Sequence, residues 1–155
     1  MIEKIIAIAE QAGEAILEIY QQDFSVEIKS DDSPLTQADK NANAVIVTGL
    51  KAIAPEIPII SEENKLTDYA IRKDWTQCWM VDPLDGTKEF IKKNGEFTVN
   101  IALIENGVPV MGVVHVPAQG ITYFAEKGKG SHKKEDGIIQ TLNIRALAAD
   151  GVLKI

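Results

Sequence analysis

The sequence predicts an α/β protein of the α+β kind, in which a pair of helices packs on a mostly antiparallel sheet. Three observations lead to this fold class. Two stretches with apolar residues at helical spacing open the chain, short apolar strands that end in acidic residues follow, and a run of strands joined by tight turns completes it. Residues 1–155 are predicted to form a single domain, since no linker, repeat or low-complexity tract divides them.

The first helix is indicated by apolar residues that recur every three or four positions from Ile2 to Tyr20. Val26–Ile28 then resembles a short strand. A second helix is expected from Thr36, whose hydroxyl can cap it with Asp39 three residues on, as in a capping box. The apolar stripe of this second helix continues through the residues before Pro55.

Short strands and helices are expected next. Ile57–Ile60 is predicted to be a buried strand, residues 66–73 a short helix, and Gln77–Val81 a strand that leads into Asp82. Thr87–Lys93 is predicted to be a single helical stretch.

A meander of strands is predicted for the rest of the chain. The segment from Phe97 to Gly130 alternates apolar runs with the turn signals Asn106-Gly107 and Gln119-Gly120. Gly137–Ile144 adds a further predicted strand.

Composition indicates a globular protein with no nucleic-acid partner. Asp and Glu outnumber Lys and Arg by 23 to 16, and nucleic-acid-binding domains usually carry a basic face. The single cysteine, Cys78, permits no intrachain disulfide and is expected to be a small buried strand residue. Glutamates interrupt the first apolar stretch, so we expect neither a signal peptide nor a membrane span. A cytoplasmic location follows, with peripheral association with the inner membrane left open.

Acidic residues stand next to the predicted elements at three places. They are Asp39, Glu62–Glu63, and the pair Asp82 and Asp85. The second and third groups directly follow predicted buried strands, and strand ends are where α/β folds commonly bind ligands. We therefore expect these carboxylates to gather.

The stretch DPLDGT, residues 82–87, is compatible with a magnesium site. Pro83 biases Asp82 toward an extended backbone, after which Asp85 can turn back toward it. Two carboxylates and the Leu84 carbonyl form the hard-oxygen set that Mg²⁺ prefers. The N–H groups of the Gly86-Thr87 turn could then hold a phosphate. The same residues also fit an ordinary turn at Asp82 with Asp85 capping a short helix.

Three motifs in order resemble the inositol monophosphatase superfamily, and most closely its 3′(2′),5′-bisphosphate nucleotidase branch. They are SPLTQAD (33–39), IISEE (59–63) and WMVDPLDGTKEF (79–90), and the similarity runs from the first helix to the last residue. The sequences SPLT and GTKEF favour the nucleotidase branch, because inositol monophosphatases more often read G-T-x-N-F.

The resemblance implies a phosphomonoesterase in a layered αβαβα fold that depends on two or three Mg²⁺ ions and is inhibited by Li⁺. Its substrate would be a small phosphorylated nucleotide, adenosine 3′,5′-bisphosphate, which loses its 3′-phosphate to give AMP. Metal-ligand positions of the family fall on Glu62, Asp82, the Leu84 carbonyl and Asp85. Asp39 falls on the position of a further metal ion and its water.

The resemblance also assigns catalytic and substrate-binding positions. Thr87 with Glu62 matches the pair that orients the attacking water. Asp85 and the amides of Gly86 and Thr87 match the phosphate-binding turn, and Lys88 lies in the stretch near the bound nucleotide. This chemistry needs no side-chain nucleophile, which agrees with structural roles for the two histidines: His115 in a predicted strand and His132 in a Gly/Lys loop.

Family members continue beyond this sequence into a segment with a W-D-x-x-A motif, whose aspartate is another metal ligand. We therefore expect residues 1–155 to be the N-terminal metal-binding domain, with the C-terminal α/β domain missing and activity impaired. The terminal VLKI is expected to leave an unpaired sheet edge through which chains could self-associate. Two alternatives stay open: an inositol or sugar monophosphatase, and a non-catalytic fragment that binds metal or phosphate.

Overall fold

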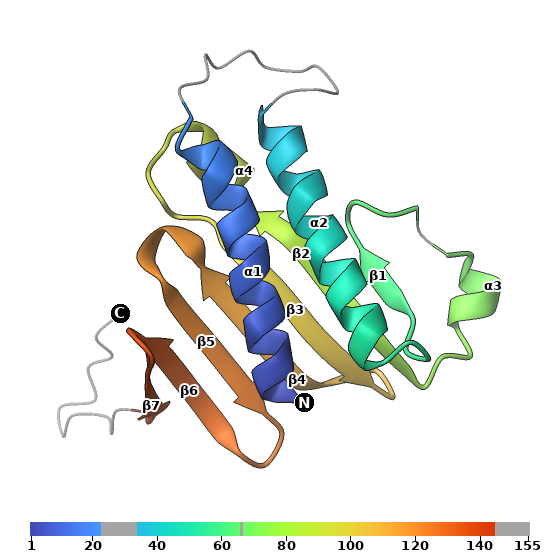
Figure 1. The fold of residues 1–155 in the computed structure, drawn as a ribbon. Coiled ribbons are helices and arrows are strands. Elements are labelled where there is room, and N and C mark those ends of the chain that lie inside the picture. The colour runs from blue at the N-terminus through green and yellow to red at the C-terminus, as the bar shows by residue number, and fades with distance from the viewer. Residues whose placement is uncertain (23–33, 66, 145–155) are drawn as a thin grey trace, which may run out of the picture.

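Two helices lie side by side across one face of a seven-stranded sheet in the computed structural model, which describes residues 1–22, 34–65 and 67–144 (Figure 1). This arrangement confirms the predicted fold class. The expected strand Val26–Ile28 and the VLKI edge lie outside the described residues. The elements are α1 (Ile2–Tyr20), α2 (Pro34–Ile53), β1 (Ile59–Ser61), α3 (Tyr69–Arg72), β2 (Gln77–Asp85), α4 (Thr87–Ile91), β3 (Thr98–Glu105), β4 (Val108–Val116), a 3-10 turn (Pro117–Gln119), β5 (Ile121–Glu126), β6 (Gly130–Glu135) and β7 (Ile138–Leu142).

The strands follow one another across the sheet in sequence order. β1 runs parallel to β2, and every later pair is antiparallel. The predicted turn Asn106-Gly107 joins β3 to β4 with φ values of 49° and 76°, the positive pair that a tight hairpin requires. Gly120, with φ of 66°, leads from the 3-10 turn into β5 as the Gln119-Gly120 signal indicated.

The core lies between the helix pair and the sheet. Apolar stripes of α1 and α2 pack on the odd-numbered residues of β2 and β3, which alternate with residues on the other face. The two helices approach closely at Gly49, where a Cβ atom would lie 2.7 Å from Ile8 Cγ1. Tyr20, Phe90 and Phe97 close one end of the core, with ring centroids 4.9 to 5.5 Å apart.

Three predicted helices have other bounds in the structure, and one of them, α4, ends at Ile91 rather than Lys93. α2 begins at Pro34, so Thr36 lies in its first turn rather than at its cap. Proline suits the first helical position, because its φ is already helical and its missing N–H would have no partner there. The helix predicted over residues 66–73 is confined to α3, which the side chain of Asp68 caps.

The strand predictions also needed correction. The first strand is β1 rather than Ile57–Ile60, and it is half-buried because it forms an edge of the sheet. Cys78 is half-buried, since it projects from the sheet face that carries no helix. β6 had no apolar alternation to reveal it. His132 lies in this strand rather than in the predicted loop, and its ring stacks on Phe124 with the ring centroids 5.1 Å apart. His115 lies in a strand as expected, within β4, and is buried.

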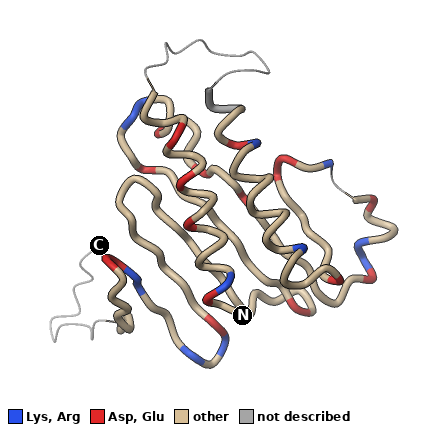
Figure 2. Tube along the Cα trace, in the orientation of Figure 1, with Lys and Arg blue, Asp and Glu red and all other residues tan. Residues whose placement is uncertain are grey.

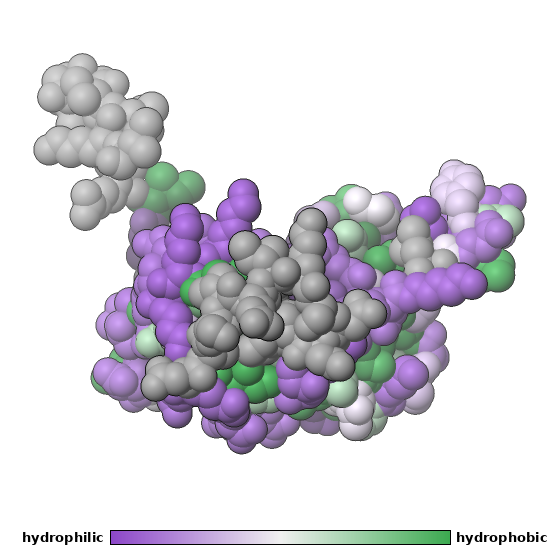
Figure 3. Space-filling model, turned by 90° about the horizontal axis from the view of Figure 1, so that it is seen from above, coloured by the Kyte–Doolittle hydropathy of each residue, from purple (hydrophilic) through white to green (hydrophobic). Residues whose placement is uncertain are grey.

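Charged residues are sparse in strands β3 and β4. Glu105 is the one Asp, Glu, Lys or Arg residue of β3 and β4, strands that the structure describes in full, and the centre of the sheet carries little charge (Figure 2). Seen from above, hydrophilic residues cover most of the described surface, with hydrophobic patches between them (Figure 3). Among the residues described, no helix combines the length and the apolar content needed to cross a membrane.

Candidate active site

β2 contains one extra residue between Asp82 and Asp85. Asp82 pairs with Asn100 and Asp85 with Thr98, so three steps along β2 match two along β3. In a regular strand, side chains three residues apart point to opposite faces, whereas a one-residue bulge returns both to the same face. The two aspartates therefore share the face that is turned away from the helices.

The structure has a bulge at Asp82, where the alternative to a magnesium site predicted an ordinary turn. The strand continues through Pro83 to Asp85, and Pro83 is almost fully buried. Proline fits a bulge because a residue there need not donate a hydrogen bond to the next strand. The local sequence DPLD thus builds a kinked strand end rather than a reversal of the chain.

Hydrogen bonds fix the carboxylate of Asp85 on this face. The side-chain amide of Asn100 donates to Asp85 Oδ2 at 3.3 Å, and the Thr98 hydroxyl donates to Asn100 Oδ1 at 3.1 Å. Asn100 also lies directly across the ladder from Asp82. One β3 residue therefore contacts the second aspartate and neighbours the first.

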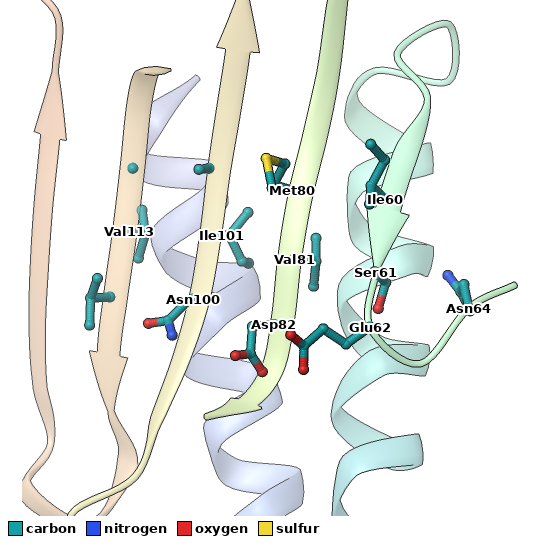
Figure 4. Close-up of a pocket in the computed structure, with 13 residues that line it drawn as sticks. Ile60, Ser61, Glu62, Asn64, Met80, Val81, Asp82, Asn100, Ile101 and Val113 are labelled. Atoms are coloured by element: carbon teal, nitrogen blue, oxygen red, sulfur yellow. The ribbon is translucent and has the colours of Figure 1, made fainter. Parts of the chain in front are cut away.

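Glu62 and Glu63 reach the same place from the neighbouring strand. β1 and β2 are parallel, with Ser61 opposite Val81, and the Glu62 N–H donates to the Val81 carbonyl at 3.4 Å. Both strands therefore end on the same side of the fold, as expected. Figure 4 shows the carboxylate of Glu62 pointing toward Asp82, and both residues line a hollow of about 620 Å³ on the helix-free face.

Asp39 joins this group from α2. Burial, the charge of Glu63, a side-chain hydrogen bond with Glu63, and the charges of Asp82 and Glu62 together raise the pKa of Asp39 to about 7. Its Oδ1 atom is buried and has no hydrogen-bond partner among the residues that the structure describes. A buried carboxylate oxygen without a partner costs free energy, so this atom is a candidate ligand for a cation.

Asp82 experiences the same repulsion. Burial raises its pKa to about 6, helped by the charges of Glu62, Asp85 and Glu63, while a hydrogen bond from the Leu84 amide acts in the opposite direction. Glu63 also belongs to this cluster, because its charge acts on both Asp39 and Asp82.

The donor set fits a hard cation, although the side chains do not form a closed cage. Asp39, Glu62, Asp82 and Asp85 supply the carboxylate oxygens. Besides burial, the charges of Asp82 and Glu62 raise the pKa of Asp39, and the charges of Glu62 and Asp85 raise the pKa of Asp82. In the described ranges, no three Asp, Glu, His or Cys side chains converge closely enough to enclose a metal by themselves. Mg²⁺ tolerates such an open site, because it keeps several water ligands and accepts backbone carbonyls.

Gly86 connects the acidic strand end to α4. Its φ of 96° and ψ of 43° are left-handed, and a Cβ atom there would lie 2.8 Å from the Glu96 carbonyl oxygen. Thr87 and Lys88 follow at the start of α4, and both are exposed. The side chain of Leu84 is buried in the core, which fixes the backbone between the two aspartates.

Several polar residues at the site were missed from the sequence. They are Asn43, Asn64, Thr98 and Asn100. Their positions depend on strand register and on the packing of α2, which no short motif encodes. A polar residue in the middle of the apolar strand segment TVNIALI was the one available signal, at Asn100.

A model described as the inositol monophosphatase family matches residues 1–148. The chain belongs to the inositol monophosphatase family. It is 48% identical over 147 residues to the 3′(2′),5′-bisphosphate nucleotidase CysQ of Salmonella typhimurium, covering 94% of this chain and 59% of that protein. The CysQ protein of Escherichia coli strain K12 is 44% identical with the same coverage.

Solved structures of this family share the fold. CysQ from Bacteroides thetaiotaomicron superposes with a TM-score of 0.79 at 52% identity, over 86% of this chain and 48% of that one. The extragenic suppressor protein suhB from Bartonella henselae superposes with a TM-score of 0.70 at 28% identity, over 84% of this chain and 50% of that one. The chain spans about 59% of the length of the first curated relatives it matches.

Proposed function

We propose that this chain forms the metal-binding part of a Mg²⁺-dependent 3′(2′),5′-bisphosphate nucleotidase. The reaction removes the 3′-phosphate of adenosine 3′,5′-bisphosphate and yields AMP and phosphate. The proposal rests on the gathering of Asp39, Glu62, Asp82 and Asp85 where β1 and β2 end. A bound cation would offset the repulsion between these carboxylates. Support for the substrate comes from relatives named as 3′(2′),5′-bisphosphate nucleotidases at 44 to 48% identity.

Four oxygen donors would hold the first Mg²⁺ ions: the carboxylates of Glu62, Asp82 and Asp85, and the carbonyl of Leu84. Asp39, with its unpaired Oδ1, would serve a further ion and its water. Bound Mg²⁺ would neutralise phosphate oxygens and lower the pKa of water, the chemistry of a two-metal phosphatase.

The remaining roles belong to the turn after β2. Glu62 and the exposed Thr87 hydroxyl would orient the attacking water, and the amides of Gly86 and Thr87 would hold the phosphate. The exposed ammonium group of Lys88 would lie near the nucleotide and attract its negative charge. Neither histidine takes part: His115 Nδ1 lies 2.9 Å from Thr122 Oγ1 in the core, and His132 stacks on Phe124.

A substrate panel at fixed Mg²⁺ tests the proposal. We expect phosphate release from adenosine 3′,5′-bisphosphate to exceed release from inositol 1-phosphate and from a sugar monophosphate by at least about tenfold, the change that a 1.4 kcal/mol difference in transition-state binding produces. Release should stop when Mg²⁺ is chelated and when Asp82 is replaced by asparagine. Faster release from inositol 1-phosphate would favour the other branch of the family, and Mg²⁺ binding without release from any substrate would favour a binding module.

A further inference from the structure

The side chain of Asn43 connects α2 to both ends of the acidic turn Ser61–Asn64. The Ser61 hydroxyl donates to Asn43 Oδ1 at 2.7 Å, and Asn43 Nδ2 donates to Asn64 Oδ1 at 3.2 Å. The backbone closes the same turn, since the Asn64 N–H donates to the Ser61 carbonyl at 3.2 Å. One carboxamide therefore contacts the first and the last residue of a four-residue turn.

Glu62 and Glu63 are the two residues inside this turn. The Glu63 N–H donates to Ser61 Oγ at 3.3 Å, so the hydroxyl that binds Asn43 also holds the backbone of Glu63. Ser61 is 4% exposed, and hydrogen bonds shielded from water are costly to leave unmade. The position of both glutamates is thus tied to the Asn43 side chain.

Asn43 stands one helical turn after Asp39. Residues four apart in a helix share a face, so α2 presents Asp39 and Asn43 to the same side of the fold. Asp39 and Glu63 are close enough there for their negative charges to repel one another. Without the bonds of Asn43, this repulsion would favour movement of the turn away from α2.

We propose that Asn43 is a positioning residue that sets the Mg²⁺ affinity of the acidic site by clamping the Ser61–Asn64 turn to α2. The inference rests on the proposed function, because it takes the acidic cluster to be the Mg²⁺ site. A carboxamide suits this task because it carries a hydrogen-bond acceptor and a donor side by side, whereas a carboxylate has no donor for Asn64. The clamp holds like charges at the spacing that a cation needs before the cation arrives.

The test compares Asn43→Ala with Asn41→Ala. Asn41 also lies on α2 and accepts a hydrogen bond at 2.7 Å, from Gln37 on the same helix, so its replacement removes a comparable bond away from the turn. By titration calorimetry we expect N43A to weaken Mg²⁺ binding about tenfold or more, the usual loss when a residue that orients metal ligands is removed. N41A should bind Mg²⁺ as the wild type does.

Ser61→Ala supplies a second route to the same result. S61A should also weaken Mg²⁺ binding, and the double variant should lose less than the sum of the two single losses, because the two residues share one hydrogen bond. Equal Mg²⁺ affinities for folded N43A and N41A would overturn the proposal. A lower thermal stability of N43A with unchanged Mg²⁺ affinity would also overturn it, since that is the signature of a merely structural residue.

Amide hydrogen exchange in chelator-treated protein separates this proposal from the proposed function. The amides of Glu63 and Asn64 should exchange about tenfold faster in N43A and S61A than in N41A, since loss of one shielded hydrogen bond is worth about 1.4 kcal/mol. This result would support the clamp even if the wild type bound no Mg²⁺, an outcome that would defeat the proposed function instead. Unchanged exchange at both amides would defeat the clamp.

Discussion

Replacement of Gly86 by alanine is expected to lower the free energy of unfolding by about 2 kcal/mol or more. A residue with a side chain at φ of 96° costs roughly 1–2 kcal/mol, and the new Cβ atom would also lie 2.8 Å from the Glu96 carbonyl oxygen and 3.1 Å from Phe97 Cα. Because both neighbours are backbone atoms, the turn itself must shift. Urea unfolding followed by circular dichroism measures the loss.

Gly107→Ala is the matched control for this variant. Gly107 has φ of 76°, yet a Cβ atom there would meet nothing within 4 Å. G107A therefore reports the cost of the left-handed backbone alone, about 1–2 kcal/mol, and G86A should exceed it. The displaced turn should also reduce Mg²⁺-dependent phosphate release in G86A, while G107A keeps it. Equal destabilisation by the two variants would contradict the close approach of Gly86 to the backbone of Glu96 and Phe97.

Asp39→Asn is expected to stabilise the metal-free chain at pH 8 by about 1 kcal/mol. Asp39 has its pKa raised from 3.8 to about 7 by burial and neighbouring carboxylates. A raised carboxyl pKa means that the stability associated with the protonated form is fully present below about pH 4 and is lost as the pH rises through 7. The full shift would correspond to a larger energy, but the residue is partly exposed and solvent screens part of the effect.

Denaturation of wild type and D39N in the presence of a chelator, from pH 4 to pH 8, tests this expectation. The two proteins should be similar in stability near pH 4, and the advantage of D39N should grow between pH 4 and pH 8. Asp74→Asn, at an exposed acidic residue just after α3, is the control for the loss of one negative charge away from the cluster. Added Mg²⁺ should stabilise the wild type more than D39N. A stability difference that does not change with pH would contradict the repulsion described at Asp39.

The helix pair and the hairpins were predictable because local sequence encodes them. The stripe from Ile2 to Tyr20 repeats at helical spacing, and Asn106-Gly107 accepts the positive φ angles of a tight turn. The place of the site was predictable for a similar reason, since DPLDGT concentrates carboxylates at a strand end. The start of α2 was missed because Thr36 and Pro34 offer competing signals, and the proline begins the helix.

The internal arrangement of the site was not predictable from local sequence. Asp82 and Asp85 share a face because β2 gains one residue against β3, and the register of β3 depends on long-range pairing. The proximity of Asp39 and Glu63 depends on how α2 is placed beside the end of β1, and no short sequence motif spans that separation. Asn43 stands within an ordinary helical stretch, so its role becomes visible only through its hydrogen bonds with Ser61 and Asn64.

Calorimetric titration of Mg²⁺ into the chelator-treated chain at pH 6.5, in two buffers of different ionisation enthalpy, tests the central claim most directly. With pKa values of about 7 for Asp39 and about 6 for Asp82, a share of these carboxyls is protonated at this pH. Mg²⁺ binding should therefore release protons to the buffer, less so at pH 8, and Asp82→Asn should weaken it at least about tenfold. Absence of binding, or equal binding by D82N and the wild type, would contradict a Mg²⁺ site at the end of β2.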